Sequence, residues 1–472
     1  MSVRTAHDDI GPAARFAAGR SARARASRES QAGVPAGDDR PDPVDVLVGQ
    51  SETRLPELVP IRYGRMLVSP FAYFRGAAAV MASDLARTPD SGLTCQLCGD
   101  AHLCNFGVFA SPERRLVFDV NDFDETHPGP WEWDVKRLAA SLAVAGRDNG
   151  FRRKVRAAVV LAAVGRYRRA MRRFAGQGNA EVWYARADVE EVDVLLKEQV
   201  GAAQRRRFAA AQARARTHDS MQAFRKLTAV VGGCRRIVSD PPLLVPVSEL
   251  LPDTDRIELE SQVRDLLAAY AGTLAPDRRR LFEGYRFVDL ARKVVGVGSV
   301  GTRCWVVLLS GRDEHDPLLL QVKEAPPSVL AGRVPHVSAG EWRSEGERVV
   351  CGQRLMQSAG DIFLGWQTVA GIDGRIRDFY VRQLRDWKGS AVVETMDPEA
   401  MRVYGALCGW TLARAHARTG DRLAIAGYLG GGDAFDRAMV EFSERYADLN
   451  ERDYGRLRAA ARSGRVAVRE GL

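Results

Sequence analysis

The chain has 472 residues, of which 46% are hydrophobic and 27% are charged, a composition typical of a globular protein with room for two domains or lobes. It contains no apolar run of about 18 residues and no apolar segment of the signal-peptide type, so the sequence predicts neither a membrane span nor a secretory leader. We therefore expect a cytoplasmic protein. The seven cysteines are an odd number, which argues against a framework of disulfide bonds.

The formal net charge of +9 comes largely from arginines, which are concentrated in residues 151–174 and 204–227. Such runs are compatible with binding to nucleic acid or to an anionic membrane. In both runs, however, apolar residues recur at helical spacing, which favours amphipathic helices with a solvated basic face. Nucleic-acid binding is therefore the weaker interpretation.

The first half of the chain reads mainly as helix. Residues 1–44 are rich in Arg, Ala, Ser, Gly and Pro and poor in large apolar side chains, so we expect a disordered tail. A helix is predicted over 70–86, and the periodicity is helical almost throughout 133–227. The proline-rich stretch 239–255 predicts a linker. We therefore expect a helical lobe over 45–255.

The second half changes character twice. After a helix at 256–274, residues 285–325 are β-rich and punctuated by turns, and 361–384 predict a hairpin around GIDG. The end of the chain returns to helical periodicity. These patterns predict a β-rich lobe over 256–395 and C-terminal helices over 396–472 that pack on the helical lobe, so the fold class is α+β.

The stretch CQLCGDAHLCNFG (95–107) concentrates residues that can carry chemistry. Cys95, Cys98, His102 and Cys104 have the number and type of a zinc site. Two facts count against zinc. The first two cysteines would point to opposite faces of a strand, and no second CxxC or HxxxH pair stands nearby.

The alternative for the same stretch is phosphoryl transfer from ATP. This reaction needs a carboxylate to accept the proton of the substrate hydroxyl and an amide oxygen to bind magnesium, which Asp100 and Asn105 supply. A second metal-binding carboxylate is also required. Asp122 lies seventeen residues past Asn105, at the end of a predicted strand, and fits that role.

The segments GDAHLCN, VNDFDE and GPWEWDVKRLA, in this order, resemble the catalytic segment of aminoglycoside and choline phosphotransferases, a branch of the protein-kinase-like superfamily. The resemblance implies that Asp100 is the catalytic base, that His102 packs within the catalytic loop, and that Asn105 and Asp122 bind the metal. It also implies that Asp134 is buried and anchors the catalytic loop by hydrogen bonds. One departure is Cys98, which stands where the family usually has a histidine or an equivalent residue.

A kinase-like enzyme also needs a glycine loop over the phosphates and a lysine on a nearby strand. Neither occurs before residue 95, but Gly296, Gly298 and Gly301 form a G-x-G-x-x-G pattern, and Lys323 follows in LLLQVKEA. A dinucleotide-binding turn would lead into a helix, whereas this pattern leads into the strand-like TRCWVVLL. A plain β-turn with a surface lysine remains the competing interpretation.

The lysine of such a lobe pairs with a glutamate on the next helix, for which we choose Glu347 over Glu345. Because the glycine pattern follows the catalytic loop in the chain, the order of motifs indicates a protein-kinase-like two-lobed fold with circularly permuted lobes. From residue 45 or so onward the sequence is also similar to a bacterial family of unknown function, domain-of-unknown-function family 2252. RYGRMLVSPFAYFRGAAAVM, GDAHLCNFG, LQVKEA and YVRQLRDWKGS carry this similarity.

The expected function is transfer of the γ-phosphoryl group of ATP, with magnesium, to a hydroxyl group of a small-molecule acceptor. Two alternatives share the fold, namely transfer of AMP and a nucleotide-binding module without catalysis. The sequence has no G-x-S-x-G or H-E-x-x-H pattern, which removes the serine hydrolase and zinc protease classes. It does not identify the acceptor or the oligomeric state.

Overall fold

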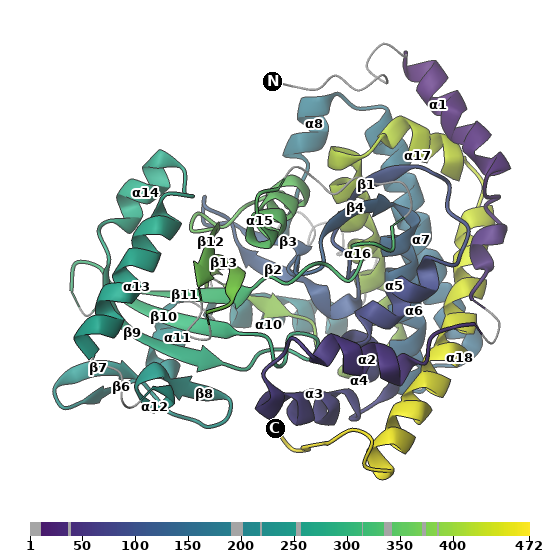
Figure 1. Cartoon of the computed structure of the whole chain (residues 1–472). Helices are drawn as coiled ribbons and strands as arrows, with labels where there is room; N and C mark the ends of the chain where they lie inside the picture. Colours follow the sequence, from purple (N-terminus) through teal and green to yellow (C-terminus); the bar gives the residue numbers. More distant parts are fainter. Residues whose placement is uncertain are drawn as a thin grey trace.

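A computed structural model of the chain describes residues 11–35, 39–189, 202–217, 220–251, 256–313, 315–334, 342–370, 374–384 and 387–472. A largely helical part packs beside a part built on a six-stranded antiparallel sheet (Figure 1). The mixture of separate helical and sheet regions confirms the α+β class.

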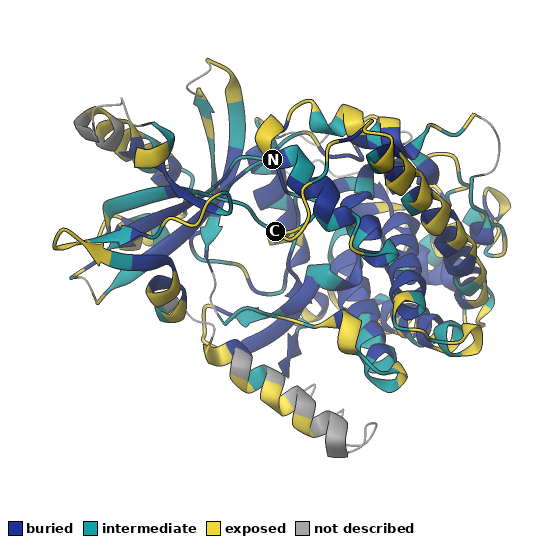
Figure 2. Cartoon of the chain, turned by 90° about the horizontal axis from the view of Figure 1, so that it is seen from below, coloured by how far each residue is buried: buried dark blue, intermediate teal, exposed yellow. Residues whose placement is uncertain are grey.

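Long helices form the core of the helical part. Helix α7 lies against α16, and α18 lies against α6 and α7. The close approach of α16 to α7 requires Gly409, because a Cβ atom there would lie 2.2 Å from the carbonyl oxygen of Ala163. Buried residues face inward and exposed residues line the outer helix surfaces (Figure 2). The bounds of these helices are α6 Glu132–Asp148, α7 Arg153–Ala175, α16 Pro398–Thr419, α17 Arg422–Leu429 and α18 Ala434–Arg462.

The expected disordered tail is wrong for residues 11–35. Helix α1 (Pro12–Ser21) packs on α17, and Arg23 donates hydrogen bonds to the carbonyls of Gly427 and Tyr428. Arginine side chains that bind the exposed carbonyls at a helix C-terminus stabilise such a segment without a large apolar surface. Composition alone misses this source of order. Residues 1–10 and 36–38 lie outside the described part of the chain.

Four short helices lead from this segment to the first strand. The predicted helix over 70–86 is broken at Ala77 into α4 and α5. Ser69 caps α4 by accepting a hydrogen bond from the backbone of Ala72. The bounds are α2 Pro43–Ser51, α3 Val59–Met66, α4 Pro70–Gly76 and α5 Ala78–Leu85.

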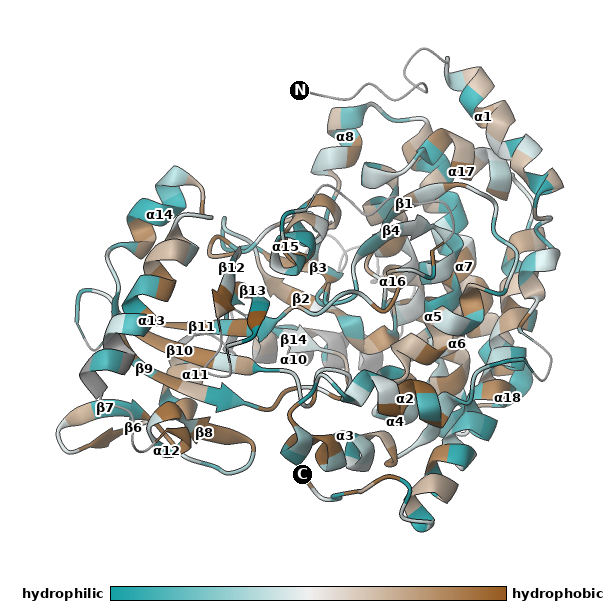
Figure 3. Ribbon diagram, viewed as in Figure 1, coloured by the Kyte–Doolittle hydropathy of each residue, from teal (hydrophilic) through white to brown (hydrophobic). Residues whose placement is uncertain are grey.

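The six-stranded sheet has the order β12-β13-β11-β10-β9-β8. Its central strands are strongly hydrophobic (Figure 3). Alternate side chains pack on opposite faces, so that Leu308 and Leu319 meet α11 while Val307 and Leu320 meet α13 and α14. The bounds are β8 Leu244–Pro246, β9 Arg286–Lys293, β10 Cys304–Ser310, β11 Pro317–Glu324, β12 Gly365–Ala370, β13 Ile376–Gln383, α11 Ser220–Leu227, α13 Arg256–Ala271 and α14 Pro276–Phe282.

The expected linker at 239–255 contains β8, which pairs with β9, and the short helix α12 (Val247–Leu250). Leu244 and Val245 are buried there. Proline is tolerated in an edge strand, which explains why a proline-rich stretch joins the sheet. Residues 252–255 of the expected linker are not among those described. The sheet part therefore begins before residue 256.

Smaller strands connect the two parts. After the catalytic loop, β2 and β3 form an antiparallel hairpin and also pair with β14 and β5. Strand β1 pairs with β4, and α15 packs on β12 and β13. The bounds are β1 Thr94–Leu97, β2 Phe106–Ala110, β3 Leu116–Val120, β4 His127–Pro130, β5 Ala187–Asp188, β6 Thr228–Val231, β7 Cys234–Ile237, β14 Gly389–Ser390, α8 Asn179–Tyr184, α10 Ala202–Thr217 and α15 Glu345–Met356.

No helix among the described residues has the length and apolar character needed to cross a bilayer.

Candidate functional site

The loop of residues 98–105 runs from β1 to β2, and we call it the catalytic loop after its predicted role. Asp134 of α6 holds its backbone. Asp134 is 1% exposed, and its carboxylate accepts hydrogen bonds from the backbone of Cys98 at 2.8 Å and of Gly99 at 3.1 Å. Gly99 has a φ of +84°, and a Cβ atom at this position would lie 2.0 Å from the carbonyl oxygen of Glu125. The anchoring role implied for Asp134 is confirmed, and the loop backbone is fixed.

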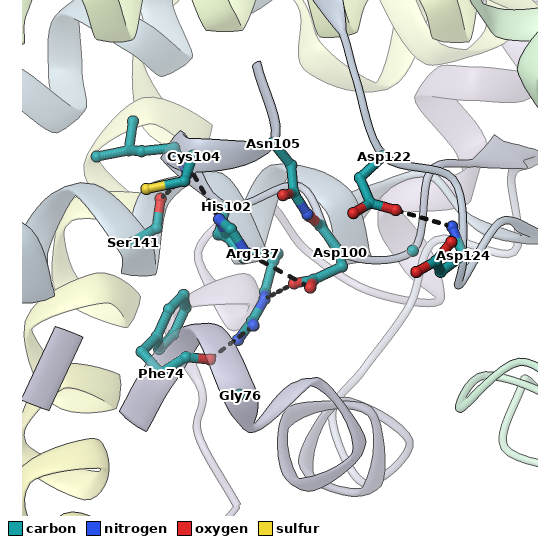
Figure 4. Close-up of polar contacts among 12 residues, drawn as sticks. Phe74, Gly76, Asp100, His102, Cys104, Asn105, Asp122, Asp124, Arg137 and Ser141 are labelled. Carbon is teal, nitrogen blue, oxygen red and sulfur yellow. Dashed lines mark hydrogen bonds and ion pairs between the residues drawn. The ribbon is translucent and has the colours of Figure 1, made fainter. Parts of the chain in front are cut away.

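Asp100 is oriented by Arg137. The Nε of Arg137 donates to the Asp100 carboxylate at 2.7 Å, and its other arm donates to the carbonyl of Phe74 at 2.7 Å (Figure 4). The Arg137 guanidinium also lies 3.9 Å from the centre of the Phe74 ring. One carboxylate oxygen is thus occupied, and the other faces His102 and the cleft.

His102 is buried within the loop and is neutral. Its Nδ1 accepts a hydrogen bond from the backbone N–H of Cys104 at 3.2 Å, so the ring proton resides on Nε2, 3.6 Å from Asp100 Oδ2. Burial lowers the pKa of His102 to about 3. A ring fixed in this state orients the loop and does not exchange protons near neutral pH.

Asn105 and Asp122 lie next to the carboxylate of Asp100 (Figure 4). Asn105 Nδ2 donates to the carbonyl of Asp100 at 2.8 Å, which leaves the amide oxygen as the group that can bind a cation. Burial, reinforced by the charge of Asp124, raises the pKa of Asp122. A bound cation would favour its charged form.

Lys323 reaches the same motif from the sheet. Its Nζ lies 2.5 Å from Asp124 Oδ2, and the Tyr380 hydroxyl donates to Asp124 Oδ1 at 2.6 Å. Burial opposes the charge of Asp124, but the charge of Lys323 and these hydrogen bonds outweigh burial and lower the pKa of Asp124 to about 2. Lys323 is 3% exposed and therefore not a surface lysine.

The glycine loop joins β9 to β10, which pair as an antiparallel hairpin. Gly296 and Gly301 have φ values of +64° and +92°, which glycine adopts at little cost. The loop continues into a strand, so a dinucleotide-binding turn is excluded. Ser299 at the loop donates to Asp124 Oδ2 at 3.1 Å.

A cleft of about 320 Å³ lies between the catalytic loop and the glycine loop. Its lining includes Asp100, His102, Asn105 and Asp122 on one side and Gly296, Gly298 and Ser299 on the other, together with Asp124, Glu125, Arg54 and Arg75. Gly301 packs against Arg54 outside the lining, and Lys323 reaches the cleft through Asp124. Two motifs distant in the chain therefore share one cavity.

Glu347, unlike Gly301 and Lys323, is neither part of the glycine loop nor paired with a residue that lines the cleft. It forms an ion pair with Arg343 at 3.0 Å, while Lys323 pairs with Asp124. The residues around Asp122 and Asp124, in the segment VNDFDE, are here called the metal motif after their predicted role. The residue of α15 that approaches the metal motif is Arg348, which donates to the carbonyls of Asp124, Thr126 and Pro326. The pairing of Lys323 with Glu347 was wrong because Asp124 already supplies a carboxylate to the lysine.

The structure adds an N-terminal wall that spacing in the sequence does not reveal. Arg54 donates to the carbonyls of Gly298 and Val300, and the backbone N–H of Leu55 donates to the carbonyl of Gly301. Arg65 of α3 donates to the carbonyl of Gly296. These contacts fix the backbone of the glycine loop and join residues more than 230 positions apart.

Zinc is disfavoured at the catalytic loop. Burial, together with the charge of Asp134, raises the pKa of both Cys95 and Cys98 well above that of a free thiol. Zinc binds thiolates, which this environment disfavours. Across the described residues, no three His, Cys, Asp or Glu side chains are grouped to hold a metal ion. The oxygen atoms of Asn105 and Asp122 are of the type that could hold magnesium, which takes few protein ligands together with water and phosphate.

Comparison with known families places this site in a context. A family model described as "Uncharacterized protein conserved in bacteria (DUF2252)" matches residues 54–460. The chain belongs to this family. The DUF2252 match spans the catalytic loop, the glycine loop and Arg54, so both walls of the cleft lie within one family unit. No curated protein and no solved structure matches the chain.

Proposed function

We propose that this DUF2252 protein transfers the γ-phosphoryl group of ATP, with magnesium, to a hydroxyl group of a small molecule. The observation that carries the proposal is the shared cleft, in which the catalytic loop and the metal motif face the glycine loop. The contact between Lys323 and Asp124 joins the two halves directly. Phosphoryl transfer depends on positioning and on neutralising charge, and this arrangement offers groups for both.

Each residue has a role in this proposal. Asp100, held by Arg137, accepts the hydroxyl proton on its second oxygen. Asn105 and Asp122 would hold magnesium, which when bound would neutralise the charge of the phosphates. The amides of Gly296 and Gly298, which line the cleft, would donate to the phosphates, and Lys323 holds Asp124 in place.

The fold that we propose is a protein-kinase-like pair of lobes in permuted order. The six-stranded sheet with α15 forms the nucleotide lobe, and it follows the catalytic loop in the chain. Helices α16 and α18 then return to pack on α7 and α6. This connectivity supports permutation because the helical lobe, which the chain enters first, is completed by its final helices after the sheet has been formed.

The first test is thermal denaturation with ATP and magnesium. A ligand that binds only the folded protein stabilises it by about 2.7 kcal/mol at a concentration of 100 times its Kd, so the melting temperature should rise. The Asp122→Asn variant should lose this magnesium-dependent rise and at least about 100-fold of the ATP turnover. Its own stability should not fall, since burial already disfavours the charged carboxylate.

The matched control is Asp433→Asn, which neutralises an exposed carboxylate paired with Arg437 far from the cleft. It should behave as the unaltered protein. Normal ATP turnover by Asp122→Asn would contradict the proposal. Release of ADP, as opposed to pyrophosphate, distinguishes phosphoryl transfer from AMP transfer, and tight ATP binding without turnover by any acceptor would leave a binding module.

A further inference from the structure

Arg75, the penultimate residue of α4, lines the cleft, and its side chain has no hydrogen bond or ion pair with another described residue. Its Nε atom is buried without a partner. A guanidinium carries five N–H donors, and leaving them unpaired beside a protein interior is unfavourable. An anion with several acceptor oxygens would satisfy them.

The other cations around the cleft are already engaged. Lys323 pairs with Asp124, and Arg137 pairs with Asp100. Arg54 donates to the carbonyls of Gly298 and Val300. His102 keeps its Nδ1 occupied by the backbone of Cys104 and contributes no positive charge. Arg54 keeps a buried Nε without a partner, but of the described basic residues that line the cleft, Arg75 is the one whose side chain has none of its donors engaged.

Arg75 lies between the catalytic loop and the glycine loop. On one side its carbonyl oxygen is 3.5 Å from the point where a Cβ atom of Gly298 would stand. On the other side its charge acts on His102 and Cys104 of the catalytic loop. A nucleotide whose phosphates lie under the glycine loop and whose last phosphate meets Asn105 and Asp122 would bring that phosphate to this place.

We propose that Arg75 binds the terminal phosphate of the nucleotide and stabilises the phosphoryl group during its transfer. In the step itself, the bond between the γ-phosphorus and the bridging oxygen breaks and a bond from phosphorus to the acceptor oxygen forms. The bridging electron pair leaves with ADP, and Asp100 takes the acceptor proton. An arginine that neutralises the equatorial oxygens of such a group accelerates transfer strongly. This assignment rests on the proposed function.

The test compares the affinities for ATP and ADP, each with magnesium, by titration calorimetry. The unaltered protein should bind ATP more tightly than ADP. The Arg75→Gln variant should lose about 10-fold or more in ATP affinity, the range of a charged hydrogen bond, while ADP affinity stays within about twofold. Arg75→Lys keeps the charge without the planar fork and should fall between the two.

The matched control is Arg87→Gln, which removes an exposed arginine paired with Asp39 outside the cleft and should leave both affinities unchanged. If Arg75→Gln weakens ATP and ADP equally, or changes neither, Arg75 does not contact the terminal phosphate and the assignment is overturned. If the unaltered protein binds neither nucleotide, the proposed function fails, and the role of Arg75 fails with it. If the unaltered protein binds ATP but the ratio of the ATP and ADP affinities is the same in Arg75→Gln, the role of Arg75 is overturned and the proposed function is not.

Discussion

At the scale of single residues, burial decides the chemical state of the catalytic loop. His102 is 4% exposed, and its Nδ1 faces a backbone N–H that can only donate. Protonation of this ring would place a second donor against that N–H and a charge in a buried site. The neutral ring therefore belongs to the folded state, whereas the unfolded chain binds a proton near pH 6.5.

The first prediction follows from this difference. The pKa of His102 is lowered to about 3 on folding, so between about pH 3 and 6.5 the unfolded chain binds more protons than the folded protein. The neutral state of His102 therefore costs the folded protein no stability above pH 6.5, and the free energy of unfolding falls as the pH drops from 6.5 toward 3. Urea unfolding of the unaltered protein should thus lose up to about 1.4 kcal/mol more per pH unit below pH 6 than that of His102→Gln.

The comparison with His102→Gln isolates one group, because all other titrating residues are common to both proteins. The glutamine can accept the same backbone hydrogen bond, so the loop should keep its shape. Parallel slopes for the two proteins between pH 4 and 6 would show that His102 is accessible to protons in the folded state. Such a result would contradict the assignment of a fixed neutral tautomer to His102.

At the scale of secondary-structure elements, α15 is the helix that joins the sheet to the metal motif. Arg348 is 2% exposed and donates to three carbonyls of the opposing segments. Glu347, one residue earlier, points to Arg343, whose side chain is 79% exposed. Two neighbouring residues of one helix should therefore contribute very differently to the stability of the fold.

The second prediction contrasts these neighbours. Arg348→Met leaves buried carbonyls without donors and should lower the free energy of unfolding by about 3–5 kcal/mol. Glu347→Gln removes an exposed ion pair and should cost less than about 1 kcal/mol, with no loss of ATP affinity. Denaturant unfolding and calorimetric titration of both variants measure these effects. A large loss of nucleotide affinity in Glu347→Gln would instead restore it as the partner of Lys323.

The elements with local signals were predictable from the sequence. The pairing of β12 with β13 and the strand after the glycine pattern follow from residue periodicity and glycine placement, while residues 371–373 of the predicted GIDG turn lie outside the described part of the chain. Strand β8 was missed because its apolar residues sit among prolines, and only pairing with β9 makes them a strand. Helix α1 was missed because its order comes from contacts with α17, more than 400 positions away.

The same distinction applies to the site. Asp100, Asn105 and Asp122 belong to one continuous stretch, and their spacing already indicates metal-dependent chemistry. Arg54 and Arg75 both come before the catalytic loop in the chain. Their place in the sequence gives no sign that they lie beside the glycine loop near residue 298. Glu347 was chosen by analogy of position on a helix. Asp124, two residues after Asp122, was the carboxylate that the lysine actually meets.

At the scale of the whole molecule, the glycine loop is supported by segments from both ends of the chain. Val300 packs with Leu58 and Ile61 of the N-terminal helices, and Leu472 packs against the same apolar cluster. The backbone N–H of Arg469 donates to the carbonyl of Pro60 at 2.9 Å. The C-terminal residues therefore brace the α3 region, which in turn holds the loop.

The third prediction tests this support. Deletion of residues 469–472 removes the contact with Pro60 and the apolar contact of Leu472, but leaves Val466 in its buried place. The global stability should change little, whereas the amides of residues 294–302 should exchange hydrogen faster, since local opening there becomes easier. Affinity for ATP with magnesium should fall a few-fold because binding must then order the loop.

The control for the deletion is Arg469→Gln, which keeps the backbone N–H that bonds Pro60 and should preserve slow exchange in the loop. Equal exchange rates in the deleted and unaltered proteins would mean that Arg54 and Leu55 alone hold the loop. Faster exchange throughout the molecule would instead show that the C-terminal residues stabilise the whole fold. Only an increase confined to the loop, accompanied by weaker nucleotide binding, links the C-terminal residues to the cleft through α3.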